Sequence, residues 1–288
     1  MRIIENHIAR EQKFPIRIQE YAVGIFKTCP TKSAVKKAIK NNLILVDELT
    51  VSTAKIIIGG EIISLLKPED DTLKKELNLK LKIVYEDEYL AVIEKPPGIL
   101  VSGNKFKTID NALQQNLQES TQLDAVRPRP VHRLDYLTTG LLLIGKTSSS
   151  IIALNKLFEN KKINKTYHAI TIGRMKTEGC IDFDIDGKKA VSNYRVVFSV
   201  KSKKFAFLNL VELIPKTGRR HQLRKHLLYI GNPILGDQVY SIDSMVLKGK
   251  GMYLHASQLD FTHPFTQKTL TLESYLPAKF LKIKQKIT

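Results

Sequence analysis

The sequence predicts an α+β protein, with a mainly antiparallel sheet in its larger part and a small α/β unit before it. Three observations lead to this prediction. After residue 80, stretches with strand character outnumber amphipathic ones, and several are separated only by tight turns, which favours hairpins. A separate helix–strand–turn–strand pattern lies within residues 1–66, and a charged stretch at 67–80 predicts a linker. At 288 residues the chain is long enough for both parts.

Charge is the strongest global signal in the composition. Lys and Arg number 46 against 28 acidic residues, a formal net charge of +18, and a field of that sign attracts polyanions. Lysine-rich surfaces also serve solubility, so charge alone favours a nucleic-acid partner only modestly. No apolar run approaches the ~20 residues of a membrane span, and the polar start MRIIENH is unlike a secretory signal. We therefore expect a cytoplasmic protein without a membrane partner. We also expect a monomer.

The two cysteines, Cys29 and Cys180, predict neither a disulfide nor a metal site. They are far apart, and neither has a Cys or His at the spacing of a zinc-ligand pair. The sequence also lacks a phosphate-binding loop, a dinucleotide fingerprint and a Ser-His-Asp set. We therefore predict no metal and no cofactor.

Residues 31–40 predict a basic helix in the small unit. Apolar residues recur there at helical spacing, Thr31 is a candidate N-cap, and Asn41-Asn42 follows the last turn. Strands are expected at 43–46 and 61–66, around an acidic turn. Three lysines repeat at every fourth position on another helix face: Lys32, Lys36 and Lys40.

This order of elements resembles the small S-four-like RNA-binding domain, first known from a ribosomal small-subunit protein. The resemblance covers residues 1–66 and implies that the three helix lysines contact RNA. Asn42 stands where a glycine is usual in such domains. A solvated lysine face on an ordinary amphipathic helix remains the alternative.

The second part, residues 81–288, is expected to begin with a hairpin that ends in Lys95-Pro-Pro-Gly98. The elements expected in it are strands at 81–85 and 89–94, a helix capped by Thr108, a helix that begins at Ser148–Ser150, strands at 165–172 and 205–213, and a helix from Gly218 to Gly231.

The segment HRLDYLTTG at 132–140 is the most informative part of the chain. Asp135 follows the cation Arg133 by two positions, and Gly140 leads directly into the apolar run 141–144. Glycine followed by a buried strand holds a charged loop on a rigid support, which suits chemistry better than solvation. Taken alone, however, such an Asp–Arg pair is more often a surface ion pair.

Residues 217–231, TGRRHQLRKHLLYIG, form the other strong constellation. Leu223, Leu227 and Ile230 predict the core face of a helix, and Arg220 and Arg224 flank that face four positions apart. Contact with RNA phosphate fits Arg219 and Lys225 better than Arg224.

Four segments in order resemble the motifs of the RluA-type RNA pseudouridine synthases, close to the RluC and RluD members that carry an S-four-like domain. They lie at 85–98, 132–140, 165–167 and 217–237. The family pattern at 132–140 reads His-Arg-Leu-Asp, two variable residues, Thr-Ser-Gly. Thr139 replaces the Ser and keeps its hydroxyl. The resemblance covers nearly all of residues 81–275.

The resemblance implies a bisected antiparallel sheet with a central cleft, and the isomerisation of uridine to pseudouridine in RNA. Asp135 is then the essential carboxylate, Tyr167 packs against the target base, and Arg224 pairs with Asp135. The 85–98 hairpin has a scaffold role, in which Lys95 contacts phosphate or is simply solvated. The residues implied to contact RNA in the catalytic domain are His132, Arg133, Arg219 and Arg220. Of these, Arg133 is implied to enter the base stack at the position that the flipped uridine leaves.

Several alternatives remain open on the sequence alone. Large-subunit ribosomal RNA is the first choice of substrate, because of the S-four-like domain, and transfer RNA is the second. A non-catalytic RNA-binding or ribosome-assembly factor could share the fold, although the intact set of Asp135, Tyr167 and Arg224 argues against it. A different base-flipping enzyme, such as a glycosylase, would release free uracil.

Overall fold

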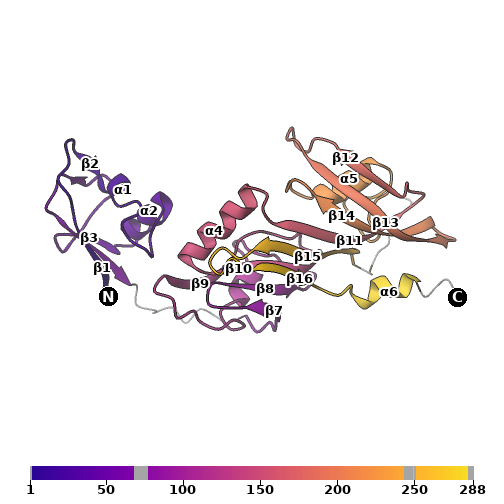
Figure 1. Cartoon of the computed structure of the whole chain (residues 1–288), viewed down its shortest axis with the longest axis horizontal. Helices are drawn as coiled ribbons and strands as arrows, with labels where there is room; N and C mark the ends of the chain where they lie inside the picture. Colours follow the sequence, from indigo (N-terminus) through magenta and orange to yellow (C-terminus); the bar gives the residue numbers. More distant parts are fainter. Residues whose placement is uncertain (1, 68–76, 243–248, 250, 285–288) are drawn as a thin grey trace. The chain divides into compact units, whose positions relative to one another are not determined.

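Two units with separate cores make up the computed structural model, which describes residues 2–67, 77–242, 249 and 251–284 (Figure 1). The smaller unit comprises Met1–Glu76, Thr121–Val126 and Thr147–Ser149, and the larger comprises Leu77–Ser120, Arg127–Lys146 and Ser150–Thr288. Most of the linker predicted at 67–80 lies outside the described residues. The domain boundaries at 66 and 81 therefore stay a prediction.

The N-terminal unit contains a four-stranded sheet in the order β1-β6-β3-β4 and a separate pair, β2 and β5. Its elements are β1 (Arg2–Ile8), β2 (Ile16–Arg17), α1 (Ile18–Tyr21), α2 (Lys32–Lys40), β3 (Ile44–Val46), β4 (Leu49–Thr50), β5 (Ile56–Ile57) and β6 (Ile62–Lys67). The predicted cap is confirmed, because the Thr31 side chain accepts a hydrogen bond from the Ala34 backbone N–H. Val35 and Ile39 of α2 then pack into one core with Ile44 of β3. Asn42 has φ 57°, a left-handed conformation that asparagine tolerates better than most residues.

The larger unit is built on a ten-stranded sheet in the order β12-β13-β14-β11-β15-β10-β8-β7, with β16 beside β15 and β9 beside β10. Its strands are β7 (Lys82–Glu86), β8 (Leu90–Lys95), β9 (Ala125–Pro130), β10 (Thr139–Thr147), β11 (Asn164–Ile172), β12 (Glu178–Asp182), β13 (Val191–Ser202), β14 (Ala206–Pro215), β15 (Leu254–Thr262) and β16 (Thr269–Glu273). Its helices are α3 (Ile109–Ala112), α4 (Ser148–Glu159), α5 (Gln222–Tyr229) and α6 (Ala278–Lys284).

Two antiparallel halves of this sheet meet at one short parallel contact. There β10 and β15 pair only through Thr139 with His255 and Gly140 with Ala256. Gly140 has φ 109°, and a Cβ at this position would collide with the backbone of Ala256. Only glycine allows the strands to approach this closely. The result is the bisected, mainly antiparallel sheet that the family resemblance implies.

The strand that follows the Asp135 loop is buried on both faces. All nine residues of β10 are buried. Leu142 and Ile144 pack into one core with Ile109 of α3, and Leu141 and Leu143 into another with Leu154 of α4. A strand enclosed in this way is a rigid support for the loop at its start.

The predicted helix 218–231 needs a correction at its start. Helix α5 begins at Gln222, and His221 before it has a left-handed backbone with φ 57°. Arg220 therefore precedes the helix and is exposed, so it does not flank the core face with Arg224. The predicted core face itself is confirmed, with Leu223 and Leu227 buried.

Candidate active site

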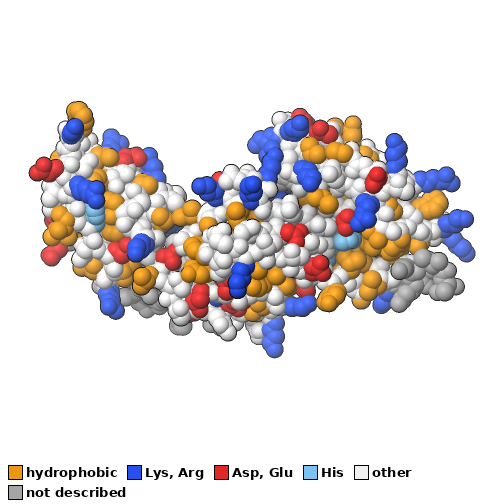
Figure 2. All heavy atoms as spheres, in the orientation of Figure 1, with side chains coloured by type: hydrophobic (Ala, Val, Ile, Leu, Met, Phe, Trp, Pro, Cys, Tyr) orange, Lys and Arg blue, Asp and Glu red, His pale blue; other side chains and the backbone are white. Residues whose placement is uncertain are grey.

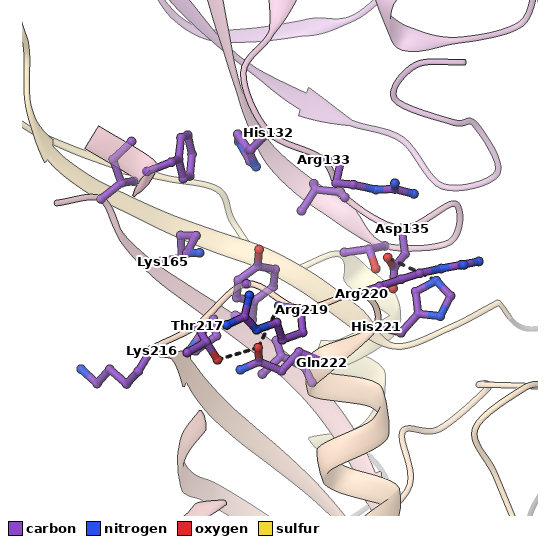
Figure 3. A pocket seen from close by; sticks show the side chains of 18 of the residues that line it. His132, Arg133, Asp135, Lys165, Lys216, Thr217, Arg219, Arg220, His221 and Gln222 are labelled. Carbon is purple, nitrogen blue, oxygen red and sulfur yellow. Dashed lines mark hydrogen bonds and ion pairs between the residues drawn. The ribbon is translucent and has the colours of Figure 1, made fainter. Parts of the chain in front are cut away.

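A cleft of about 880 Å³ lies in the larger unit, between the loop before β10, the start of β11 and the segment before α5 (Figure 3). This volume is within the usual range of ligand sites. The cleft brings together all seven site residues predicted for the catalytic domain: His132, Arg133, Asp135, Tyr167, Arg219, Arg220 and Arg224.

The backbone that follows Asp135 is fixed by Lys95, the last residue of β8. Lys95 is only 1% exposed, and its ammonium donates hydrogen bonds to the carbonyl oxygens of Pro96, Tyr136 and Thr138 at 2.9, 3.2 and 2.8 Å. Burial lowers the pKa of Lys95 to about 8, and nearby Asp135 acts in the opposite direction. Both expectations for this lysine, a phosphate contact or a solvated side chain, are wrong.

Arg224, in helix α5, holds the Asp135 carboxylate. Its Nη1 lies 3.2 Å from Asp135 Oδ2, as predicted, and Nε and Nη2 donate to the two oxygens of Asp237 at 2.6 and 2.8 Å. Burial lowers the pKa of Arg224, but Asp237 first and Asp135 second more than offset it, so the pKa is raised. The guanidinium thus places a permanent positive charge directly beside the Asp135 carboxylate.

Asp237 is a site residue that sequence reasoning missed. It is 1% exposed, and its Oδ1 also accepts hydrogen bonds from the backbone N–H groups of Val239 and Tyr240. In the sequence it only closes the family-like segment 231–237. Its position in that segment was the available signal. The structure shows that this carboxylate orients Arg224, so that one edge of the guanidinium is left for Asp135.

His221 also lies against Asp135, a contact that the sequence analysis did not predict. Its Nε2 is 3.7 Å from Asp135 Oδ1, and its Nδ1 is within hydrogen-bonding distance, 2.9 Å, of the Tyr240 hydroxyl. Burial lowers the pKa of His221, while Asp135 acts in the opposite direction. The left-handed backbone of His221 turns the ring into the cleft, and such conformations are frequent at functional sites.

Tyr167 lines the same cleft from β11. The pairing of β11 with β15 shifts register between Thr166 and Tyr167, and such bulges re-aim side chains. Burial and then the charge of Asp135 raise the pKa of the Tyr167 phenol well above its usual value. The hydroxyl therefore stays protonated at neutral pH and can donate a hydrogen bond beside the carboxylate.

Comparisons with known proteins identify the family. Residues 89–229 match the model of the RNA pseudouridylate synthase family. The ribosomal large subunit pseudouridine synthase D of Nitrosomonas europaea is 32% identical, over 89% of this chain and 80% of that protein. The ribosomal large subunit pseudouridine synthase C of Rickettsia prowazekii is 31% identical, over 93% of this chain and 96% of that protein. The chain belongs to the RNA pseudouridine synthase family.

A solved structure agrees with this assignment. The human RNA pseudouridylate synthase domain containing 4 superposes with a TM-score of 0.56 and 28% identity, over 69% of this chain and 90% of that chain. The protein is thus a pseudouridine synthase, an isomerase, and RNA is its substrate.

None of the described helices is long and apolar enough to cross a membrane. Within the described residues, no three His, Cys, Asp or Glu side chains are grouped to hold a metal ion.

The residues predicted to contact RNA differ in how free they are to do so. Arg133 and Arg220 are exposed at the cleft. Arg219 is exposed as well, and its Nε donates to the Lys189 carbonyl at 3.0 Å. Lys225, also considered for phosphate contact, is instead paired with Asp186 at 2.9 Å.

His132 has a structural bond that limits its use in RNA binding. Its Nε2 accepts a hydrogen bond from the Leu143 backbone N–H at 2.9 Å. Burial, and secondly the charge of Lys165, lowers the pKa of His132 to about 3. A ring that is neutral at physiological pH cannot attract phosphate by charge. His132 therefore ties the loop to β10, and it can offer RNA only a neutral ring at the cleft wall.

The three predicted RNA-binding lysines of the N-terminal unit, Lys32, Lys36 and Lys40, are exposed on α2. The ammonium of Lys32 is 2.5 Å from Glu20 Oε1, so part of its charge is already balanced. Lys and Arg side chains are spread over the visible face of each unit (Figure 2). The distribution is compatible with a polyanionic partner of either unit.

Proposed function

We propose that this pseudouridine synthase modifies uridines of large-subunit ribosomal RNA, in the cytoplasm and as a monomer. The substrate class is inferred from the relatives, several of which are named ribosomal large subunit pseudouridine synthases, C or D. The basic α2 of the N-terminal unit supports the same choice, because it offers a second cationic surface for a large folded RNA.

The observation that carries the proposed chemistry is the arrangement around Asp135. A carboxylate that is 18% exposed is held by a buried arginine, which a second carboxylate orients in turn. Asp135 is then the essential carboxylate. It acts either by covalent addition to the ribose or the uracil, or by removal of a ribose proton. The bond from ribose to the uracil nitrogen breaks, the base rotates, and a bond to the uracil carbon forms with loss of the proton from that carbon. The freed nitrogen takes up a proton, so the reaction is a net isomerisation.

Other residues of the cleft hold and position the RNA. Tyr167 packs against the base, and its protonated hydroxyl donates a hydrogen bond close to Asp135. The uridine must leave its stack to reach a cleft of this kind. Arg133, exposed beside Asp135 in the same loop, fills the vacated position. Arg219 and Arg220 contact the sugar-phosphate backbone of the RNA.

Mapping of pseudouridines in cells with and without the gene tests the proposal. We expect at least one site in large-subunit ribosomal RNA to lose pseudouridine, and the purified protein to restore it on the unmodified RNA. A lost site in transfer RNA alone would identify the alternative substrate. Unchanged RNA would indicate a binding or assembly factor, and free uracil with an abasic site would indicate a glycosylase. Asp135→Asn serves as the inactive control.

A further inference from the structure

We propose that Lys165, Gly218 and Arg219 form a subsite for a backbone phosphate next to the target uridine. The proposal rests on the proposed function, because it assigns the RNA group that one end of the same cleft binds. Figure 3 shows Lys165 on the other side of the cleft from Asp135 and His221, with Arg219 between them. The carboxylate end is suited to the base, and the cationic end is suited to the anion attached to the same nucleotide.

Lys165 has a partly buried charge without an anionic partner. It lies on β11 two residues before Tyr167 and lines the cleft, and burial alone lowers its pKa. Its ammonium forms no hydrogen bond or ion pair with any residue that the structure describes, and it lies 5.8 Å from the centre of the Phe158 ring. Withdrawing a cation from water without a partner is unfavourable, and an incoming anion would offset that cost.

Gly218 leaves open space directly in front of this ammonium. A Cβ on Gly218 would have a single neighbour within 4 Å, the Lys165 Nζ at 4.0 Å. Its φ is not in the left-handed region, so backbone conformation does not require glycine here. Gly218 is exposed, and within the described residues its N–H forms no backbone hydrogen bond. The position therefore offers a free amide donor and room for a ligand beside a cation.

The segment around Gly218 is held rigidly by a buried glutamine. Gln222 is 4% exposed, and its Oε1 accepts hydrogen bonds from the Thr217 hydroxyl at 2.7 Å and the Arg219 N–H at 2.9 Å. Its Nε2 donates to the Val191 carbonyl at 2.9 Å. The turn is thus fixed on both sides of Gly218 before any ligand arrives, which reduces the entropy lost on binding.

The donor set favours a phosphate over other ligands. Arg219 uses its Nε for the Lys189 carbonyl, and this bond orients the guanidinium while its two terminal nitrogens have no partner among the described residues. A guanidinium, a lysine ammonium and a backbone N–H together suit the oxygens of a phosphodiester. The positive charges of Lys165 and Arg219 exclude a cationic ligand. The carboxylates that line the cleft, Asp135 and Glu159, pair with neither Lys165 nor Arg219 in the described chain.

The first experiment uses inorganic phosphate as the probe and does not depend on activity. Backbone amide signals of the full chain are followed by NMR during a phosphate titration, with chloride at matched ionic strength as the control. We expect the Gly218 amide to shift saturably in the wild type and in Lys165→Arg, and to lose that response in Lys165→Met. A shift of the same size in Lys165→Met, or no saturable shift in the wild type, would overturn the subsite.

The second experiment distinguishes an RNA phosphate from free phosphate. Binding of an RNA stem-loop is measured with each phosphate next to the target uridine replaced in turn by an uncharged methylphosphonate. One replacement should weaken binding about tenfold, the scale of one lost charged hydrogen bond, and should have no further effect in Lys165→Met. Lys161→Met removes another lysine of the same cleft and should keep the full methylphosphonate effect.

The outcomes separate the two proposals. Equal penalties in Lys165→Met and the wild type would show that Lys165 does not contact that phosphate. Saturable phosphate binding at Gly218 without any pseudouridine formation would contradict the proposed function and leave the subsite standing. Pseudouridine formation without saturable phosphate binding or a methylphosphonate penalty would support the proposed function and contradict the subsite.

Discussion

Two basic regions of this protein, the cleft and helix α2, hold their cationic side chains in opposite environments. In the cleft, Arg224 is buried, has fixed carboxylate partners and touches Asp135. On α2, Lys36 and Lys40 are exposed and lie four positions apart on one helix face. A charge in a partly buried site interacts strongly with the few groups fixed around it, whereas the charge of an exposed lysine is screened by water and salt. The comparison suggests that the cleft supplies chemistry and α2 supplies affinity.

The largest effect should come from the carboxylate itself. Asp135→Asn keeps the size and polarity of the side chain but cannot act as nucleophile or base. We expect turnover to fall by about 100-fold or more while RNA affinity is spared. Single-turnover conversion and RNA binding measured on the same variant check this. Retention of more than about a tenth of the rate, less than ~1.4 kcal/mol of barrier, would contradict the role of Asp135.

The next largest effect should come from Arg224 and from Asp237, the carboxylate that orients it. Arg224→Lys keeps the charge but loses the fork that reaches Asp135 and Asp237 together, so turnover should fall by about 10- to 100-fold with little change in RNA affinity. Asp237→Asn should act in the same direction, because it no longer holds one edge of the guanidinium. Rate and binding constants for both variants are the measurement. A loss of affinity as large as the loss of rate would mean that Arg224 contacts RNA directly.

A third effect distinguishes Arg133 from Arg224. If Arg133 replaces the flipped base, Arg133→Ala should reduce turnover on a stem-loop by about tenfold or more, since unstacking costs a few kcal/mol in a helix. On an unstructured oligomer that is also a substrate, the loss should be small. An equal loss on both RNAs would assign Arg133 to Asp135 instead of to the stack.

The smallest effect on chemistry is expected from α2. Replacement of Lys32, Lys36 and Lys40 by Gln should leave turnover at saturating RNA unchanged and reduce the dependence of binding on salt, by slightly less than one unit of log–log slope per phosphate contact. Lys32 should contribute less than the others, because Glu20 already pairs with it. Affinity measured at several salt concentrations is the test. An unchanged slope would show that this helix face is only solvated, and deletion of residues 1–66 would then leave RNA discrimination intact.

Features encoded by neighbouring residues were predictable from the sequence. The Thr31 cap, the end of α2 at Asn41-Asn42 and the strand after Gly140 depend on spacing and backbone preferences within a few positions. The family motifs likewise predicted the contact between Asp135 and Arg224. The start of α5 was predicted four residues too early, at Gly218 instead of Gln222. There a left-handed His221 and the side chain of Gln222 replace the usual helix start, and neither follows from periodicity.

Only the tertiary structure decided which distant residues surround that contact. The order of the strands brings together Asp135 and Arg224, 89 positions apart, and with them Asp237 and His221. Burial likewise decided that Lys95 holds backbone carbonyls and that His132 is neutral. Residue type and spacing specify local conformation and the groups available for chemistry. Burial and pairing depend on which segments the sheet brings side by side, and they determine whether a charge is screened, neutralised or available to react.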